Sequence, residues 1–183
     1  MRKILLGAAG FAESVAAIDR FESRKTYFAD AQRRAAQVRR PLVVIGAPGA
    51  GAHTRLMPAY GCGDVCIDLV GCDGCPVSIT ADLTQGHVAQ VQDNSAVVYV
   101  SCVLEYVSDP QAAWNEILRM AGSVDNVFVV TVQPWTVTSV LYPGSRWMIT
   151  KAPPEQSTFE FQPVGGAKKL VYAGALAFML FGR

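Results

Sequence analysis

Six residues in the first half of the chain have the composition of a loop that can hold an anionic or nucleotide ligand. The segment 46–51 reads Gly-Ala-Pro-Gly-Ala-Gly and directly follows the apolar run 42–45. Glycines between a buried strand and a helix let backbone amides approach such a ligand closely. A loop that holds the phosphates of ATP also needs a Lys directly after the last glycine, and Ala52 stands there instead. The sequence therefore disfavours ATP phosphotransfer.

Two acidic residues follow this loop at positions where short strands are expected to end. Asp68 lies about 20 residues after the glycines, the separation at which dinucleotide-binding folds place an acid on the ribose hydroxyls. Asp82 stands in an Ala-Asp-Leu run at residues 81–83. Each acid can also be an ordinary turn residue at a strand end.

Alternating strands and helices are needed to position these residues. Asp109 and Pro110 are typical of a helix start, and Gly122 is typical of its end. This alternation predicts an α/β fold with a mostly parallel sheet. Apolar and largely β-branched runs predict buried strands at residues 42–45, 65–70, 77–80, 96–101 and 126–132.

The two ends of the chain predict different elements. Residues 1–40 carry apolar side chains at helical spacing and predict two helices, broken near residues 23–26. Residues 158–162 alternate like an edge strand, and a glycine pair after them predicts a turn into an antiparallel last strand near residues 175–181. We therefore divide the chain into an N-terminal helical segment and, from 41–183, an α/β domain that ends in an antiparallel hairpin.

Charge and hydropathy indicate the cellular location and the partners of the chain. It has a net charge of +1, but residues 1–40 hold nine Lys and Arg against four Asp and Glu. A basic helical segment can lie on an anionic partner or a membrane surface, or can simply be solvated. The first residues also resemble a short signal peptide, and both apolar ends are shorter than the roughly 20 residues that span a bilayer. We expect a cytoplasmic protein with peripheral membrane or protein contacts and no nucleic-acid partner.

The stretch 93–120 combines a buried strand, a polar turn and a capped helix. It contains Leu-Glu-Tyr at 104–106, Asp-Pro at 109–110 and Glu-Ile-Leu-Arg at 116–119. With the glycine loop and the two acids, this order over residues 41–133 resembles class I S-adenosylmethionine-dependent methyltransferases. The resemblance implies a Rossmann-like, doubly wound fold and S-adenosylmethionine as the cofactor. The residues that it assigns to the cofactor are Gly46, Gly49, Gly51, Asp68, Asp82, Leu83 and Ser101.

The methyl acceptor is not identified by the sequence. The resemblance places its pocket near Glu105 and near the aromatic segments that follow the fifth strand, and the candidate residues are Glu105, Trp135, Tyr142 and Arg146. Methyl transfer by direct displacement needs an aligned acceptor and a nearby base, not an enzyme nucleophile. Aromatic side chains with an Arg suit a planar or anionic acceptor, and they equally suit a protein interface.

Two departures from the family pattern leave a second interpretation open. Val44 or Ile45 stands where the family usually has an acid, and Tyr106 stands where it commonly has His. The alternative is a methyltransferase-fold protein without activity that serves as a structural or membrane-associated subunit of a larger assembly.

The chain has five cysteines, an odd number that does not resemble an extracellular disulfide framework. The spacings Cys62-x3-Cys66 and Cys72-x2-Cys75 admit a tetrahedral zinc site. However, Cys66 falls inside the expected second strand, where a cysteine is commonly a small buried apolar residue. We therefore expect no metal, and we expect Cys102 to line the cofactor site.

Overall fold

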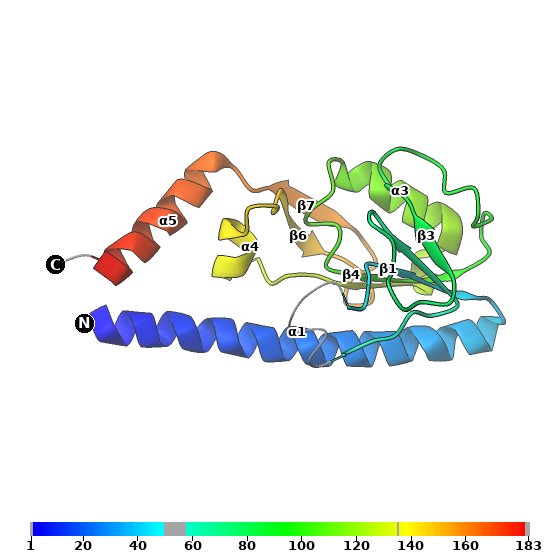
Figure 1. Cartoon of the computed structure of the whole chain (residues 1–183), viewed down its shortest axis with the longest axis horizontal. Helices are drawn as coiled ribbons and strands as arrows, with labels where there is room; N and C mark the ends of the chain where they lie inside the picture. Colours follow the sequence, from blue (N-terminus) through cyan, green and yellow to red (C-terminus); the bar gives the residue numbers. More distant parts are fainter. Residues whose placement is uncertain (1, 50–57, 135, 182–183) are drawn as a thin grey trace.

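The computed structural model describes residues 2–49, 58–134 and 136–181. They form an α/β unit with a five-stranded parallel sheet of order β3-β2-β1-β4-β5 and a separate antiparallel hairpin (Figure 1). The strands are β1 (Leu42–Ile45), β2 (Val65–Asp68), β3 (Ser78–Thr80), β4 (Val97–Ser101), β5 (Val127–Val130), β6 (Trp147–Lys151) and β7 (Glu160–Pro163). The helices are α1 (Arg2–Val38), α3 (Pro110–Ala121), the short 3-10 helix η1 (Val124–Asn126), α4 (Val137–Leu141) and α5 (Gly166–Phe181).

β1 is the central strand, and all four of its residues are buried. Successive side chains of a strand point to opposite faces of the sheet. Val43 and Ile45 join a core with α3, whereas Leu42 and Val44 join a second core with α1. The continuous apolar run 42–45 is what a parallel strand covered by helices on both faces requires. Figure 1 shows α1 and α3 on the two sides of the sheet.

The ends of α3 are those that the sequence predicts. The carboxylate of Asp109 accepts the N–H groups of Gln111 and Ala112, both at 2.9 Å, and Pro110 occupies the first turn. Gly122 ends the helix in the left-handed region at φ +71°, and a Cβ there would collide with the side chain of Asn94. The capping Asp and the left-handed Gly both act on the backbone next to them, which explains why the sequence is sufficient to predict the two ends of the helix.

One continuous helix, α1, replaces the two helices expected before residue 40. Residues 23–26 contain neither Gly nor Pro, so nothing in the local sequence breaks the hydrogen-bond ladder. Arg24 is also buried here, where its Nε donates to Oγ of Ser101 at 3.0 Å. This contact holds the helix on the sheet at the expected break. The C-terminal half of α1 covers the sheet, and its N-terminal half extends beyond it (Figure 1).

The prediction of an antiparallel strand near residues 175–181 is wrong, because residues 166–181 form the helix α5. The hairpin lies earlier in the chain, where β6 pairs with β7. Short apolar runs are ambiguous between strand and helix, and this one is rich in Ala and Leu, which favour helices. No helix within the described ranges is long and apolar enough to cross a membrane.

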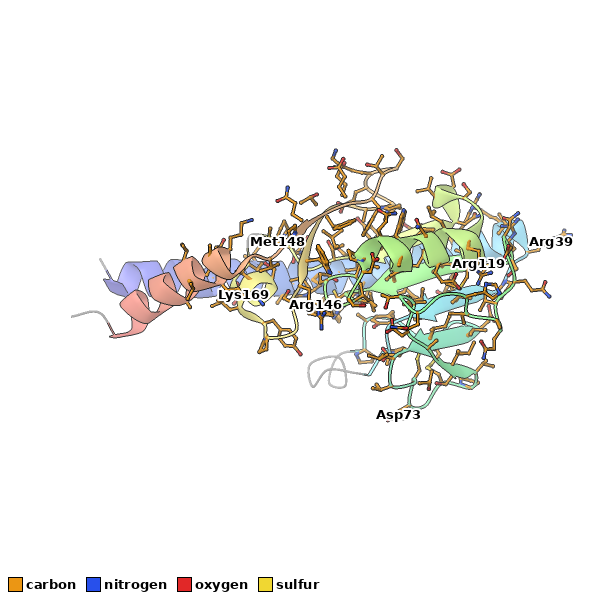
Figure 2. All side chains as sticks on the ribbon, turned by 90° about the horizontal axis from the view of Figure 1, so that it is seen from above. Arg39, Asp73, Arg119, Arg146, Met148 and Lys169 are labelled. Carbon is orange, nitrogen blue, oxygen red and sulfur yellow. A yellow bond between two sulfur atoms is a disulfide. The ribbon has the colours of Figure 1, made fainter. Side chains whose placement is uncertain are left out.

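Glu116 and Arg119 tie α3 to the segment that precedes β4. The carboxylate of Glu116 accepts the N–H of Val88 at 2.8 Å and two N–H groups of Arg119 at 2.7 and 2.8 Å. Arg119, labelled in Figure 2, also donates to the carbonyl of Val91 at 2.9 Å. Burial would raise the pKa of Glu116, but the hydrogen bonds from Arg119 and Val88 lower it. In this chain, both charged residues of the Glu-Ile-Leu-Arg motif therefore make structural contacts.

We expect Glu116→Ala to lower the free energy of unfolding by about 2 kcal/mol, because it leaves a half-buried guanidinium and the Val88 N–H without their partner. Urea unfolding followed by circular dichroism measures this change. The matched control is Gln111→Ala on the same helix, whose exposed side chain bonds Asn115, and we expect it to stay within about 0.5 kcal/mol of the wild type. Equal unfolding midpoints for the two variants would contradict the structural role of Glu116.

Candidate functional site

A pocket of about 370 Å³ lies at the carboxyl ends of β1, β2 and β4. From β1 the chain continues to β2 on one side, and from β4 it continues to β5 on the other, so the strand order reverses between β1 and β4. Open α/β sheets bind ligands at this switch point, and small-molecule sites occupy roughly 300–1,000 Å³. We call this cavity the switch-point pocket. Its lining includes Gly46, Asp68, Asp82, Leu83, Tyr106 and Arg146.

Gly46 forms the tight end of β1 at the floor of the pocket. Its φ of +97° lies in the region that favours glycine, and its N–H donates to the carbonyl of Ile67 at 2.9 Å. A Cβ at this position would lie 2.8 Å from Cγ2 of Val103 and 3.0 Å from the carbonyl oxygen of Ser101. The hydroxyl of Tyr60 donates to the Gly46 carbonyl at 3.3 Å. The position therefore excludes every side chain.

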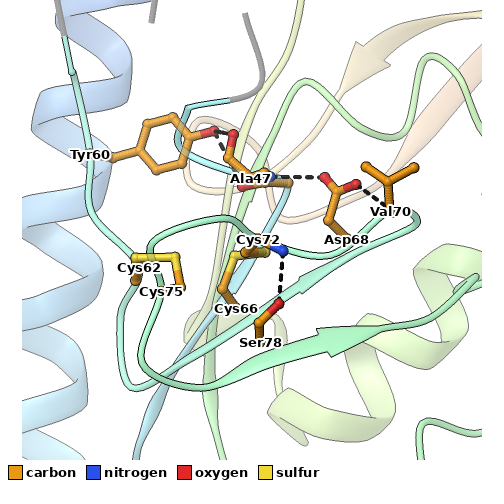
Figure 3. The surroundings of a disulfide bond; sticks show 10 residues. Ala47, Tyr60, Cys62, Cys66, Asp68, Val70, Cys72, Cys75 and Ser78 are labelled. Atoms are coloured by element: carbon orange, nitrogen blue, oxygen red, sulfur yellow. Dashed lines mark hydrogen bonds between the residues drawn. A yellow bond between two sulfur atoms is a disulfide. The ribbon is translucent and has the colours of Figure 1, made fainter. Parts of the chain in front are cut away.

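Asp68 holds the start of the glycine loop against the end of β2. One oxygen of its carboxylate accepts the N–H of Ala47 at 2.8 Å, and the other accepts the N–H of Val70 at 3.1 Å (Figure 3). A carboxylate has about four acceptor positions, so these two bonds leave it able to accept from a ligand. Asp68 is half-buried and lines the pocket.

Asp82 lies across the pocket, after β3. Its Oδ1 accepts both the backbone N–H of Thr84 at 2.9 Å and the Thr84 hydroxyl at 2.7 Å. These hydrogen bonds lower the pKa of Asp82, so it is ionised at neutral pH. Leu83 is buried beside it and gives the pocket an apolar wall. The Thr84 hydroxyl lies 3.0 Å from that of Ser108, which joins this loop to the one that follows β4.

Four of the eleven candidate site residues do not line the pocket, although the structure describes them. Ser101 is buried and its hydroxyl is bound by Arg24. Tyr142 is exposed, with its ring 5.4 Å from that of Tyr106. Gly49 is exposed in the loop after β1, and Glu105 is buried.

The remaining candidate residues divide into two groups. Gly51 and Trp135 lie outside the described residues. Arg146, which is labelled in Figure 2, lines the pocket from the segment just before β6. A cofactor residue and an acceptor residue of the sequence analysis therefore meet at the same cavity.

Glu105 is a buried carboxylate between β5 and the hairpin. Its Oε1 accepts the N–H of Val132 at 2.6 Å, and Oε2 is buried without a hydrogen-bond partner among the described residues. Burial raises its pKa to about 7, although the Val132 N–H acts in the opposite direction. Its backbone carbonyl accepts the N–H groups of Arg146 and Trp147 at 2.8 and 3.1 Å. Glu105 thus brings the segment that carries Arg146 to the pocket.

Cys102 and Tyr106 are two pocket residues whose side chains have raised pKa values. Cys102 has a φ of +51°, a left-handed conformation that is uncommon outside glycine, and its N–H donates to the carbonyl of Val130 at 2.8 Å. Burial, and then the charge of Glu105, raise the pKa of the Cys102 thiol to about 11. The same two causes raise the pKa of the Tyr106 phenol. Both groups are therefore protonated at neutral pH.

The loop after β4 supplies lining residues that the sequence analysis did not single out, namely Val103, Val107 and Ser108. They carry no motif of their own. Their position directly after a predicted central strand is the signal that points to them, because ligands bind at the carboxyl ends of such strands.

Four of the five cysteines are paired in two disulfides, although their odd number does not resemble an extracellular disulfide framework. Cys62 bonds Cys75, and Cys66 bonds Cys72 (Figure 3). Cys66 is buried in β2, as expected, yet it is not a free thiol. The chain turns back after β2 through glycines with positive φ at 71 and 74, and this return brings Cys72 and Cys75 to the strand. Sequence spacing alone does not reveal that approach.

Known proteins do not place the chain in a family. Neither family models, nor curated proteins, nor solved structures contain a match to it. The geometry of the switch-point pocket is therefore the basis for assigning a function.

The buried carboxyl of Glu105 predicts a pH-dependent stability. Its pKa rises on folding from 4.5 to about 7, so its contribution is fully present below about pH 4.5 and is lost as the pH rises through 7. The burial of Glu105 causes this rise in its pKa and outweighs the charges of Arg20 and Arg24, which lower it. Between about pH 5 and pH 8 the wild type should therefore lose free energy of unfolding. We expect this loss to be roughly 2 kcal/mol smaller in Glu105→Gln, whose side chain cannot ionise.

Urea unfolding at the two pH values measures this difference. The control is Glu155→Gln, at an exposed carboxylate that accepts from the Tyr27 hydroxyl. If the wild type and Glu105→Gln lose the same stability over this range, Glu105 does not change its protonation in the folded chain.

Proposed function

We propose that the chain is a Rossmann-like class I methyltransferase domain that binds S-adenosylmethionine in the switch-point pocket. One observation carries the proposal. Gly46, Asp68, Asp82 and Leu83 come from the ends of three different strands, yet they line one cavity. Each of them belongs to a motif that, by resemblance, serves the same cofactor. Their convergence at the reversal of strand order supports a nucleoside-binding site.

The chemistry of these side chains suits the parts of the proposed cofactor. Gly46 leaves open the space that a side chain would fill. The carboxylate of Asp68 has acceptor positions for two neighbouring ribose hydroxyls, and the ionised Asp82 can accept from the adenine amino group. Ile67 and Leu83 offer apolar surface to the adenine ring. The two carboxylates also favour the positive charge of a sulfonium.

The pocket limits the acceptors that such a domain could methylate. When bound, S-adenosylmethionine supplies an electrophilic methyl group that the acceptor displaces directly. Cys102 and Tyr106 keep their protons at neutral pH because their pKa values are raised, so neither serves as the base. Tyr106 can still donate a hydrogen bond, and the exposed Arg146 attracts negative charge. These residues favour an acceptor that carries its own negative charge.

A pair of glycine variants tests the cofactor site. We expect the wild type to bind S-adenosylmethionine and S-adenosylhomocysteine in isothermal titration calorimetry. Gly46→Ala should weaken this binding at least tenfold, about 1.4 kcal/mol, because its Cβ pushes against the Ser101 carbonyl and strains a positive φ. Gly49→Ala is the matched control, because a Cβ there meets no atom of the described residues within 4 Å. Absence of binding at millimolar ligand would exclude the proposed cofactor.

A pair of acid variants tests the ribose contact separately. Asp68→Asn keeps an acceptor for one backbone amide but loses the charge and one oxygen, and we expect binding about tenfold weaker. Asp73→Asn, at the exposed tip of the loop between β2 and β3 (Figure 2), should bind like the wild type. Thermal unfolding of both variants checks that the fold is retained. Equal affinities of Asp68→Asn and the wild type for the cofactor would mean that Asp68 only holds the loop and does not contact the ribose.

A second candidate is a methyltransferase-fold subunit without activity that lies on a membrane or another protein. Apolar side chains stay exposed on the helices that extend beyond the sheet: Phe11 is 72% exposed, Ile18 64% and Leu170 75%. Figure 1 shows α1 and α5 side by side at that end, and they contact each other. Large exposed apolar patches mark interaction surfaces. The protonated Cys102 and Tyr106 also favour binding over catalysis.

Vesicle flotation tests the membrane form of this candidate. We expect the full chain to float with vesicles of anionic phospholipid, and Phe11→Glu with Ile18→Glu to reduce the floated fraction several-fold, because charge is excluded from the lipid interior. The control is Val77→Glu, an exposed apolar position directly before the edge strand β3. A wild-type chain that stays in the unbound fraction would exclude a lipid surface as the partner.

A further inference from the structure

Four cysteine sulfurs gather beside β2, away from the switch-point pocket. Cys66 comes from the strand itself, Cys62 from the segment before it, and Cys72 and Cys75 from the loop that follows. The sulfurs of Cys66, Cys72 and Cys75 all lie within 4.8 Å of one another, and Cys62 is bonded to Cys75 (Figure 3). Two disulfides are therefore packed against each other.

This arrangement is close to that of a tetrahedral metal site. Zinc binds four thiolates at about 2.3 Å, which places the sulfurs about 3.8 Å apart at the corners of a tetrahedron. The sulfurs of Cys66, Cys72 and Cys75 already lie within 4.8 Å of one another, and reduction frees the bonded pair Cys66–Cys72 to move apart to that spacing. The Cα atoms of the two pairs are 5.4 and 6.1 Å apart, so the two side chains of each pair leave the backbone close together.

The loop after β2 has the backbone of a short metal-binding turn. The N–H of Cys75 donates to the carbonyl of Cys72 at 3.2 Å, and Gly74 between them has a φ of +79°. The N–H of Cys72 donates to Oγ of Ser78 at 2.7 Å. These bonds fix the Cys-x2-Cys turn without help from the disulfides. A Cys-x2-Cys turn opposite a second cysteine pair is the ligand pattern of structural zinc sites.

We propose that these four cysteines form a redox-gated zinc site. The two disulfides are its oxidised state, and the reduced state holds one Zn²⁺ between four thiolates. In reduction, a dithiol passes two electrons and two protons to each disulfide, opens it to two thiols and leaves as a disulfide itself. Zn²⁺ then replaces the four thiol protons, which go to water. In the reverse direction, two disulfides of the glutathione type take up two electrons each and four protons from water and leave as four thiols, which re-forms the two protein disulfides and releases Zn²⁺.

The site has a structural consequence at β2. Metal binding joins three segments at one point, namely the chain before β2, the strand and the loop between β2 and β3. Near its start, that loop contains Val70, whose N–H donates to the carboxylate of Asp68. The proposed metal therefore stabilises the loop beside the switch-point pocket, but it does not depend on what the pocket binds.

Metal content of the full chain tests the proposal. The protein is reduced with a phosphine, incubated with Zn²⁺ and desalted, and we expect one zinc per chain by mass spectrometry of the metal. Replacement with Co²⁺ should give the absorption of a tetrahedral thiolate complex. Oxidised glutathione should then release the metal and re-form two disulfides, detected by intact mass. A reduced, folded chain that takes up neither ion would overturn the site, and zinc that stays bound after oxidation would overturn the gating.

Variants separate metal binding from disulfide formation. Cys75→His can still ligate zinc but cannot bond Cys62, so we expect it to bind one zinc when reduced and to release it on oxidation through the Cys66–Cys72 disulfide alone. Cys66→Ser together with Cys72→Ser should lose stoichiometric zinc. Cys102→Ser is the control for metal content and should take up one zinc like the wild type, because this free thiol lies at the other site. Stoichiometric zinc in the double variant would overturn the proposal, whether or not Cys75→His folds.

Discussion

The end of β1 is confined between two neighbouring strands, and the arrangement of the candidate site depends on this confinement. Ile45 is paired in parallel with Ile67 of β2 and with Val100 of β4, so the residues that follow all three strands emerge at one edge of the sheet. Gly46 continues β1 into a space bounded by the carbonyl of Ser101. Because Gly46 has no side chain, the chain can turn in this narrow space and bring the N–H of Ala47 to the carboxylate of Asp68.

A second constraint comes from polar groups that are buried where α1 and the hairpin meet this edge. Arg24 reaches from α1 to Ser101, and Glu105 reaches the backbone of Val132. Buried charges cost free energy unless they are well paired, and the raised pKa of Glu105 shows that its compensation is incomplete. Its backbone carbonyl nevertheless anchors Arg146 and Trp147. The same residue therefore positions the hairpin and the cation that lines the pocket.

β2 serves two sites with different chemistry. Asp68 at its end belongs to the switch-point pocket, and Cys66 within it belongs to the sulfur cluster. Both depend on the loop that follows the strand, since Val70 binds Asp68 and Cys72 binds Cys66. This loop replaces the helical crossover that usually follows such a strand.

The sequence by itself determined the five parallel strands and both ends of α3, and a family resemblance singled out Gly46, Asp68, Asp82 and Leu83, which line one pocket. These features depend on signals within a few residues, such as a β-branched run or a capping Asp, and on the rule that parallel strands share their carboxyl edge. Only the tertiary structure decided the rest. The continuity of α1, the helical state of 166–181, the burial of Glu105 and the cysteine pairs depend on contacts between residues far apart in the chain, and no local pattern encodes which of those contacts form.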